Sequence, residues 1–290
     1  MAIVNLHDLV NDSSQAARFN RLFDQFWVLY DKIWPDSESE NPKNDVLKGL
    51  NLEKRLVNGE YGVLINVSVD KNDDLNGFNW SYYYPKSDSL CPTYFAVDNS
   101  VRGQGVTARR LLEQIPVMQK QLGELGHDMR SIVLQCADPA RDVEANEYNM
   151  DNRKRLELFS KGGARWVSQI ENTEPDYAEE RSNYLLLCYP VPGKGYPDAS
   201  AISAYVDEYY DIWSVLPHKN DPSYLEYKAQ LDLWQQAEVA NVSFYFRRVA
   251  QDGARRSVDG PDGKSISVAA PARDGTEKLL SLNQALELKN

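Results

Sequence analysis

A short glycine-containing run, Val-Arg-Gly-Gln-Gly-Val-Thr at residues 101–107, is the feature that most constrains the fold of this chain. It follows an apolar stretch, residues 94–97, and precedes a segment whose apolar residues have helical spacing. This order predicts a strand, a tight turn and a helix. The first N–H groups of a helix have no partner within it, and the helix dipole is positive there. The junction therefore predicts an anion site, for example for a phosphate group. Gly103 and Gly105 would let the backbone approach the anion closely.

The spacing of this run excludes two familiar phosphate-binding loops. A Walker loop requires Gly-Lys followed by Ser or Thr, and the dinucleotide fingerprint requires glycines spaced as Gly-x-Gly-x-x-Gly. Neither pattern is present in the run. The sequence therefore predicts a different phosphate-bearing ligand.

The composition limits the class of protein. At 290 residues, with 42% hydrophobic and 11% aromatic residues, the chain can form one domain with an appendage or two domains. The formal net charge of -11 argues against nucleic acid as a partner, because phosphate neutralisation needs a basic face. The same charge is compatible with a cationic substrate, although solubility alone explains it more simply.

Three features bear on metal binding and location. The three cysteines, Cys91, Cys136 and Cys188, are widely spaced and show no metal-ligand pattern, so we expect no metal. The first residues lack the basic and apolar regions of a signal peptide, and no apolar run reaches the roughly 18 residues of a membrane span. We expect a cytoplasmic protein that does not bind a membrane.

Periodicity predicts the order of the elements. We expect helices at residues 15–34, 45–57, 108–125 and 149–161, and strands at 61–69, 78–84, 93–97, 131–136, 164–170 and 184–189. This order indicates an α/β (α+β) fold with a mixed, largely antiparallel central sheet flanked by helices. We expect residues 1–192 to form this domain. Residues 193–290 would be an extension of helices and a hairpin, of unknown role, that covers a sheet edge or completes a homodimer.

Arg102-Gly103-Gln104-Gly105, in this order of elements, resembles the GNAT superfamily of N-acetyltransferases. The family signature at this turn is Gln/Arg-x-x-Gly-x-Gly/Ala, and here Thr107 stands in the last place. A second motif follows, because the family commonly carries an Asn and then a helix that ends in Tyr-x-x-x-Gly. Here Asn152 lies in the first turn of the helix predicted at 149–161, which contains Phe159 and ends before Gly163. The resemblance covers roughly residues 18–190.

The resemblance implies a site for acetyl-CoA as co-substrate. The pyrophosphate of coenzyme A would lie on the N–H groups of Gln104, Gly105, Val106 and Thr107, while Arg102 would fix the turn or add charge. The main chain of Phe95 and Val97 would bind pantetheine and polarise the thioester carbonyl. Asn152 would hydrogen-bond the pantetheine arm, or it is an ordinary helix-capping residue.

The resemblance also implies direct transfer of an acetyl group to an amine, aided by a general acid and a general base. Many relatives take the acid from a Tyr where this chain has Phe159, and the base from a Glu where it has Gln135, Cys136 and Ala137. Asp138 is the best-placed candidate base and Tyr148 is a candidate acid. Each is equally an ordinary turn or surface residue.

The sequence leaves two functions open. The first is an acyl-CoA-dependent N-acyltransferase acting on a primary amine of a small molecule or peptide, and the net charge is compatible with a cationic one. The alternative is a GNAT-fold protein that binds coenzyme A without turnover and acts as an interaction or regulatory module. Aromatic residues with helix or strand periodicity, which either line an acceptor groove or form core, are Trp27, Tyr30, Trp80, Tyr82 and Tyr84.

Overall fold

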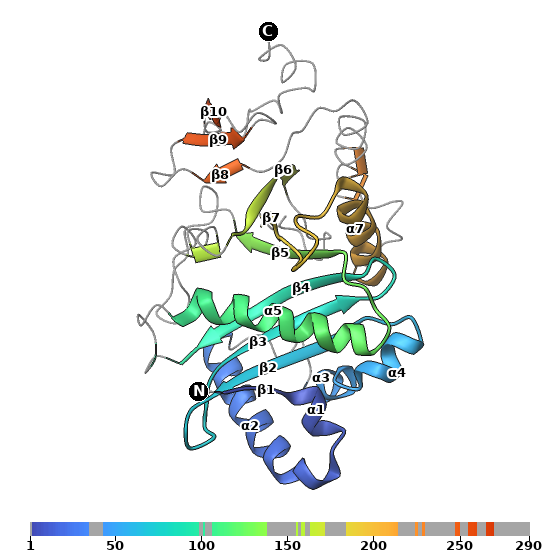
Figure 1. Ribbon diagram of the computed structural model, residues 1–290, viewed down its shortest axis with the longest axis vertical. Coiled ribbons are helices and arrows are strands. Elements are labelled where there is room, and N and C mark those ends of the chain that lie inside the picture. The colour runs from blue at the N-terminus through green and yellow to red at the C-terminus, as the bar shows by residue number, and fades with distance from the viewer. Residues whose placement is uncertain are drawn as a thin grey trace.

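The computed structural model describes most of the first 213 residues and short segments beyond them (Figure 1). The described residues are 2–34, 43–98, 101, 106–137, 155, 158, 159, 163–171, 184–213, 224, 225, 228, 229, 247–249, 255–259 and 265–269.

The described strands form one ten-stranded sheet in the order β1-β2-β3-β4-β5-β7-β6-β8-β9-β10. β4 and β5 are parallel, and every other neighbouring pair is antiparallel. The predicted mixed, largely antiparallel sheet flanked by helices is therefore confirmed. The strands are β1 (Ala2–Asn5), β2 (Gly62–Val69), β3 (Leu75–Tyr84), β4 (Ser89–Val97), β5 (Ser131–Ala137), β6 (Arg165–Glu171), β7 (Tyr184–Tyr189), β8 (Arg247–Val249), β9 (Arg255–Asp259) and β10 (Ser265–Ala269).

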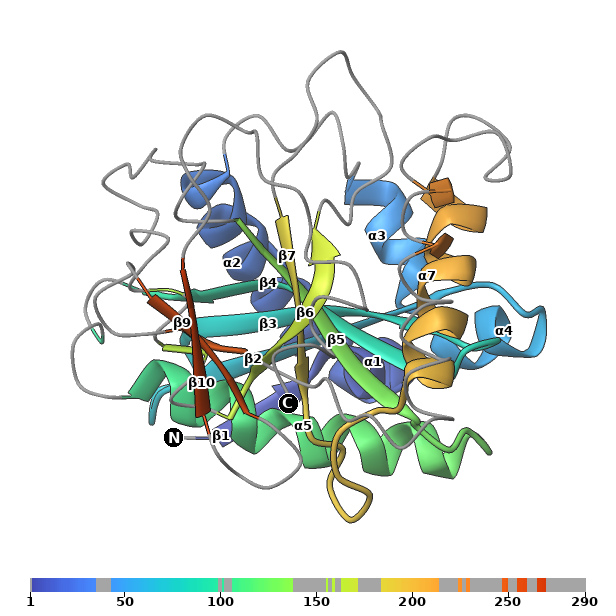
Figure 2. The ribbon, with the colours of Figure 1, turned by 90° about the horizontal axis from the view of Figure 1, so that it is seen from above.

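Helices cover both faces of the sheet. In Figure 2, α2 and α7 lie on one side of the sheet and α5 on the other. Two separate hydrophobic clusters match this arrangement, one containing residues of α2 and α7 and the other residues of α5. The helices are α1 (Leu6–Val10), α2 (Ala16–Ile33), α3 (Lys43–Gly49), α4 (Leu52–Val57), α5 (Val106–Glu124) and α7 (Ala199–Trp213), with a 3-10 turn at Ser13–Gln15.

Aromatic rings dominate the core between α2 and the sheet. Phe26 of α2 lies edge-on to Phe78 of β3, with 4.7 Å between ring centroids, and Tyr30 lies 5.2 Å from Trp80. Trp27, Tyr30, Trp80, Tyr82 and Tyr84 are all buried in this cluster. These residues therefore form core, and the interpretation that they line an acceptor groove is wrong.

The region before β2 differs from the prediction of one helix over residues 45–57. The chain turns near Asn51, so α3 and α4 are separate. Val46 and Leu50 pack into the α2 cluster, whereas Leu52 and Leu56 pack into the α5 cluster. The break between α3 and α4 falls between these two pairs, so each short helix packs one pair into its own cluster.

Further differences lie near the N-terminus and in the strand bounds. β1 and α1 were not predicted, since they are short. Gln15 precedes α2 without a side-chain cap, and the side chain of Asp12 caps the 3-10 turn. β3 and β4 both begin earlier than predicted.

The chain beyond residue 192 continues both the core and the sheet. Buried residues of α7, including Ile202 and Tyr205, belong to the same cluster as those of α2. β8 pairs with β6 through Trp166 and Arg247, and β9 and β10 follow as a hairpin. The helix predicted at 224–240 has four described residues, and the division into residues 1–192 and 193–290 stays a prediction.

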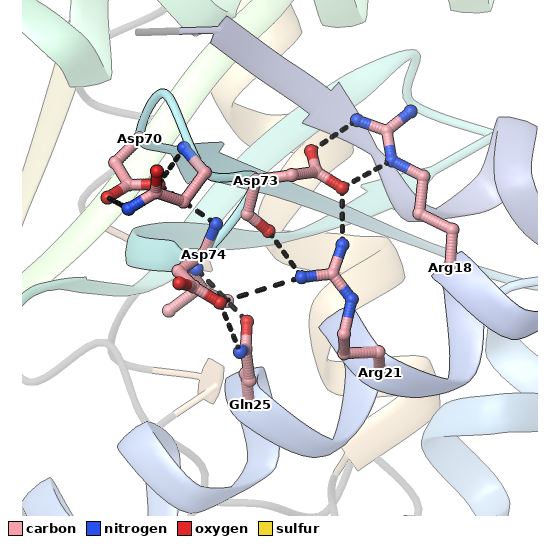
Figure 3. Close-up of polar contacts among 8 residues, drawn as sticks. Arg18, Arg21, Gln25, Asp70, Asp73 and Asp74 are labelled. Carbon is pink, nitrogen blue, oxygen red and sulfur yellow. Dashed lines mark hydrogen bonds and ion pairs between the residues drawn. The ribbon is translucent and has the colours of Figure 1, made fainter.

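An ionic cluster fastens the β2–β3 turn to α2 (Figure 3). Arg18 donates from Nε and Nη2 to the two carboxylate oxygens of Asp73, at 2.9 and 2.6 Å. Arg21 also pairs with the Asp73 carboxylate and donates to its main-chain carbonyl at 2.8 Å. Gln25 donates a hydrogen bond to the carboxylate of Asp74 and accepts one from the N–H of Leu75. The bond from Arg18, with the charges of both arginines, holds the pKa of Asp73 below its usual value.

We expect Asp73→Asn to lower the free energy of unfolding by about 1 kcal/mol at pH 7, a small value because the ion pairs are partly exposed. Asn tolerates the positive φ of 66° at this position, so the variant isolates the charge. Because the folded pKa is lowered, the contribution is complete above the unfolded pKa of about 4 and is lost as the pH falls through the folded value.

Urea denaturation from pH 7 to pH 2 measures this difference. Asp74→Asn is the control, since Asp74 is more exposed and its ion pair is longer at 3.5 Å. A difference between Asp73→Asn and the parent protein that does not shrink at low pH would contradict the assignment.

Candidate functional site

β4 and β5 pair over only two residues and then part. Ser89 lies opposite Ser131 and Leu90 opposite Ile132, and the register goes no further. Both strands nevertheless continue, β4 to Val97 and β5 to Ala137. We call the separated parts, Cys91–Val97 of β4 and 133–137 of β5, the β4–β5 fork. Beyond Leu90 and Ile132, the two strands are not paired with each other.

Hydrogen bonds fix the closed end of the fork. The hydroxyl of Ser131 donates to that of Ser89 at 2.7 Å, and the N–H of Arg130 donates to the carbonyl of Asp88 at 2.7 Å. The hydroxyl of Tyr83 donates to the Asp88 carboxylate at 2.5 Å. Burial, together with this bond, raises the pKa of Tyr83 far above its ordinary value, so its hydroxyl remains a donor. The closed end is therefore a rigid reference point.

The backbone of β4 changes course where the fork opens. Its register with β3 shifts between Tyr94 and Pro92, so that Thr93 is an extra residue, a β-bulge. A bulge bends a strand, and Pro92 beside it has no N–H to donate. Thr93 is exposed, and Tyr94 and Phe95 are half-buried, whereas the rest of β4 is buried. The bend thus brings three consecutive residues to the surface in the middle of the sheet.

The N–H groups of Phe95 and Val97 point toward the fork. The N–H of Asp98, just after β4, donates to the carbonyl of Asn76 in β3 at 2.9 Å. Because alternate residues of a strand direct their N–H groups to opposite edges, those of Phe95 and Val97 point away from β3, toward β5. The binding role of these two residues stays a prediction.

The first helix after β4 in the sequence is α5. β4 ends at Val97 and α5 begins at Val106, so the predicted strand and the predicted helix are both present on either side of the glycine run. The first turn of α5 contains no acidic residue, which agrees with an anion at its N-terminus. Among the predicted cofactor residues, Phe95, Val97, Val106 and Thr107 are described. The other predicted cofactor residues lie outside the described residues: Arg102, Gly103, Gln104, Gly105 and Asn152. Both candidate catalytic residues, Asp138 and Tyr148, also lie outside them.

The β5 side of the fork receives a tyrosine that the sequence did not suggest. The hydroxyl of Tyr209 in α7 donates to Oε1 of Gln135 at 3.4 Å. Gln135 is half-buried, whereas its neighbour Cys136 points to the opposite face and is buried there. The tyrosine-rich periodicity of residues 201–215 predicted the helix, but nothing in the sequence placed it against β5.

Phe159, expected from the resemblance to stand in place of a family tyrosine, is half-buried. Its ring contacts the α5 cluster, and its main-chain carbonyl accepts hydrogen bonds from the Ala164 N–H at 2.9 Å and the Tyr189 hydroxyl at 3.3 Å. A phenyl ring cannot supply a proton, so a general acid would have to come from another residue.

The described residues also bear on metal binding and on membrane spanning. No group of three or more His, Cys, Asp or Glu side chains is placed to hold a metal ion. No described helix combines the length and apolar character needed to cross a membrane.

The sequence matches no family model, and no curated protein matches it. Among solved structures, the chain is similar to the aminoglycoside 6'-N-acetyltransferase from Enterococcus faecium, with 15% identity, 65% of this chain and 96% of that chain covered, and a TM-score of 0.41. An aminoglycoside 6'-N-acetyltransferase complexed with coenzyme A gives 17% identity, the same coverages and a TM-score of 0.40. Nourseothricin acetyltransferase gives 16% identity, coverages of 45% and 66%, and a TM-score of 0.32.

A buried carboxylate on α7 supports the closed end of the fork. Glu208 is 3% exposed and accepts the N–H of Lys86 at 3.2 Å and that of Ser87 at 2.7 Å. Both donors lie in the turn that joins β3 to β4, directly before Asp88. α7 therefore fixes the backbone from which the closed end is built.

We expect Glu208→Gln to lower the free energy of unfolding by about 2 kcal/mol, because the amide has one acceptor oxygen and leaves a buried N–H unpaired. Urea denaturation measures the change, with the exposed Glu60→Gln as a control of the same chemistry. Equal stability of the Glu208→Gln variant and the parent protein would show that the carboxylate does not hold the turn.

Proposed function

We propose that this protein is a GNAT-type acyl-CoA-dependent N-acyltransferase, and that acetyl-CoA is its co-substrate. The observation that carries the proposal is the β4–β5 fork. A bulged strand presents N–H groups toward the fork, and a helix starts after the glycine turn that follows this strand. The motifs at Arg102–Gly105 and at Asn152 support the same cofactor from the sequence.

The residues present fit an extended thioester-bearing ligand. The N–H groups of Phe95 and Val97 would bind its amide and thioester carbonyls and stabilise negative charge on the thioester oxygen during transfer. The N–H groups from Gln104 to Thr107, at the start of α5, would bind a pyrophosphate. Asn152 would hold the pantetheine arm. Bound there, acetyl-CoA supplies an activated acyl group.

The acceptor in this proposal is a primary amine of a small molecule or peptide, and the net charge favours a cationic one. Asp138 remains the proposed general base and Tyr148 the proposed general acid. We further propose a cytoplasmic protein that requires no metal, and a homodimer in which residues 193–290 take part.

A second function is favoured by two specific residues. Phe159 has no hydroxyl, and Gln135 at the fork cannot act as a base. A protein that binds coenzyme A without turnover, as an interaction or regulatory module, would need neither group. Release of free thiol from acetyl-CoA across a panel of amines separates the two functions, since only the transferase consumes thioester.

Calorimetric titration with acetyl-CoA tests the site that both functions share. We expect saturable binding in the parent protein and its loss in Gly105→Val, because a side chain at this position would project toward the pyrophosphate. The absence of binding in the parent protein at about 1 mM ligand, a limit near −4 kcal/mol, would refute both functions. Unchanged affinity in Gly105→Val would refute the placement of the pyrophosphate.

The main chain at Phe95 can be tested separately. We expect Phe95→Pro to weaken acetyl-CoA binding by about tenfold, the effect of one lost hydrogen bond to the ligand. The sheet should tolerate the change, because the N–H that proline lacks points away from β3. Phe95→Leu keeps the N–H and is the control. A loss of affinity in Phe95→Leu as large as that in Phe95→Pro would assign the effect to the ring.

A further inference from the structure

The two faces of the β4–β5 fork carry different side chains. On the α5 face, Phe95 packs beside the α5 cluster. On the opposite face, Tyr94 lies on the β4 side, packed against the α2 cluster. Gln135 lies on the β5 side of this same face, since it is two residues beyond Val133, which belongs to that cluster. Tyr94 and Gln135 are both half-buried.

Two helices border the fork on this second face. From α2, Tyr30 approaches the Tyr94 ring to 5.2 Å between centroids, and the neighbouring Trp34, half-buried itself, approaches it to 5.1 Å. From α7, Tyr209 reaches Gln135 at 3.4 Å. One turn earlier on α7, the hydroxyl of Tyr205 reaches Sγ of Cys91 at 3.5 Å. α7 therefore lies along the boundary between β4 and β5.

The contact between Tyr209 and Gln135 joins a buried group to a half-buried one. Tyr209 is 8% exposed and stacks beside Tyr205 and Tyr84, so its ring is fixed by packing. Gln135 has three rotatable side-chain bonds, and a hydrogen bond from a fixed hydroxyl restricts its carboxamide to few orientations. A carboxamide both donates and accepts hydrogen bonds, so it can orient an amine without removing its proton.

We propose that the Gln135 carboxamide orients the acceptor amine in the fork, and that Tyr209 is a positioning residue for this carboxamide. This inference rests on the proposed transferase function. In the transfer, the amine nitrogen bonds to the thioester carbonyl carbon, the carbon–sulfur bond breaks, and one amine proton ends on the thiolate sulfur. The thioester is bound from the β4 main chain, so the two substrates have separate determinants.

A double-mutant cycle tests the assignment, with initial rates of thiol release measured at varied concentrations of an amine acceptor found in the panel. We expect Gln135→Leu to lower kcat/KM for the amine by about tenfold and Tyr209→Phe by about three- to fivefold, the effects of one lost or misplaced hydrogen bond. The double variant should be no slower than Gln135→Leu alone, because Tyr209 acts through Gln135. Calorimetric affinity for acetyl-CoA should stay within twofold in all three.

Tyr205→Phe is the matched control, since it removes a buried hydroxyl from the same face of α7 without touching Gln135. We expect it to leave kcat/KM unchanged. Additive losses in the double variant would overturn the positioning role, and so would unchanged kinetics in Tyr209→Phe. A loss of acetyl-CoA affinity in the variants would place the pair on the thioester side and overturn the proposal. Failure of the parent protein to bind acetyl-CoA would instead refute the proposed function, and this inference with it.

Discussion

The two-residue parallel pairing of β4 with β5 is the constraint on which the rest of this structure depends. Had the two strands stayed paired along their length, β5 would lie against the edge of β4 toward which the N–H groups of Phe95 and Val97 point. Had they not paired at all, no fixed point would set the width of the fork. At one end, Ser131 is hydrogen-bonded to Ser89 and the N–H of Arg130 to the carbonyl of Asp88. At the other end, the bulge at Thr93 turns β4 away. The pairing thus fixes the place within the sheet where β4 and β5 part.

Side chains distant in sequence hold this arrangement in place. The β2–β3 turn is fastened to α2 through Asp73, and the β3–β4 turn is fastened to α7 through Glu208. Both are carboxylates that accept several hydrogen bonds. Each therefore holds its loop through the directions of these hydrogen bonds as well as through its charge. α7 contacts the turn beside the closed end through Glu208 and the open part of the fork through Tyr209. A helix beyond residue 192 is therefore part of the support of the candidate site.

The sequence predicted the helices and strands better than the contacts between them. Apolar periodicity located α2, α5 and α7, and β-branched and aromatic runs located β2 and β7, because burial of one face leaves a regular pattern. The same logic failed at residues 45–57, where neighbouring apolar residues serve opposite faces of the sheet. The bulge at Thr93 and the contact of Tyr209 with Gln135 have no local signal, since each depends on how distant segments pack. The glycine run predicted that a helix would start after it, and α5 does. The catalytic roles of Asp138 and Tyr148 stay predictions.

A site built from main-chain donors places few demands on side-chain identity. Any residue except proline offers an N–H at position 95, so the requirement falls on the course of the backbone: the bulge, the bend and the pinned end. Those features are specified by scattered polar contacts such as Ser89 with Ser131 and Glu208 with the β3–β4 turn. Such contacts can be made by other residue types in other chains. The course of the backbone at the fork therefore places little constraint on which side chains stand at most of its positions.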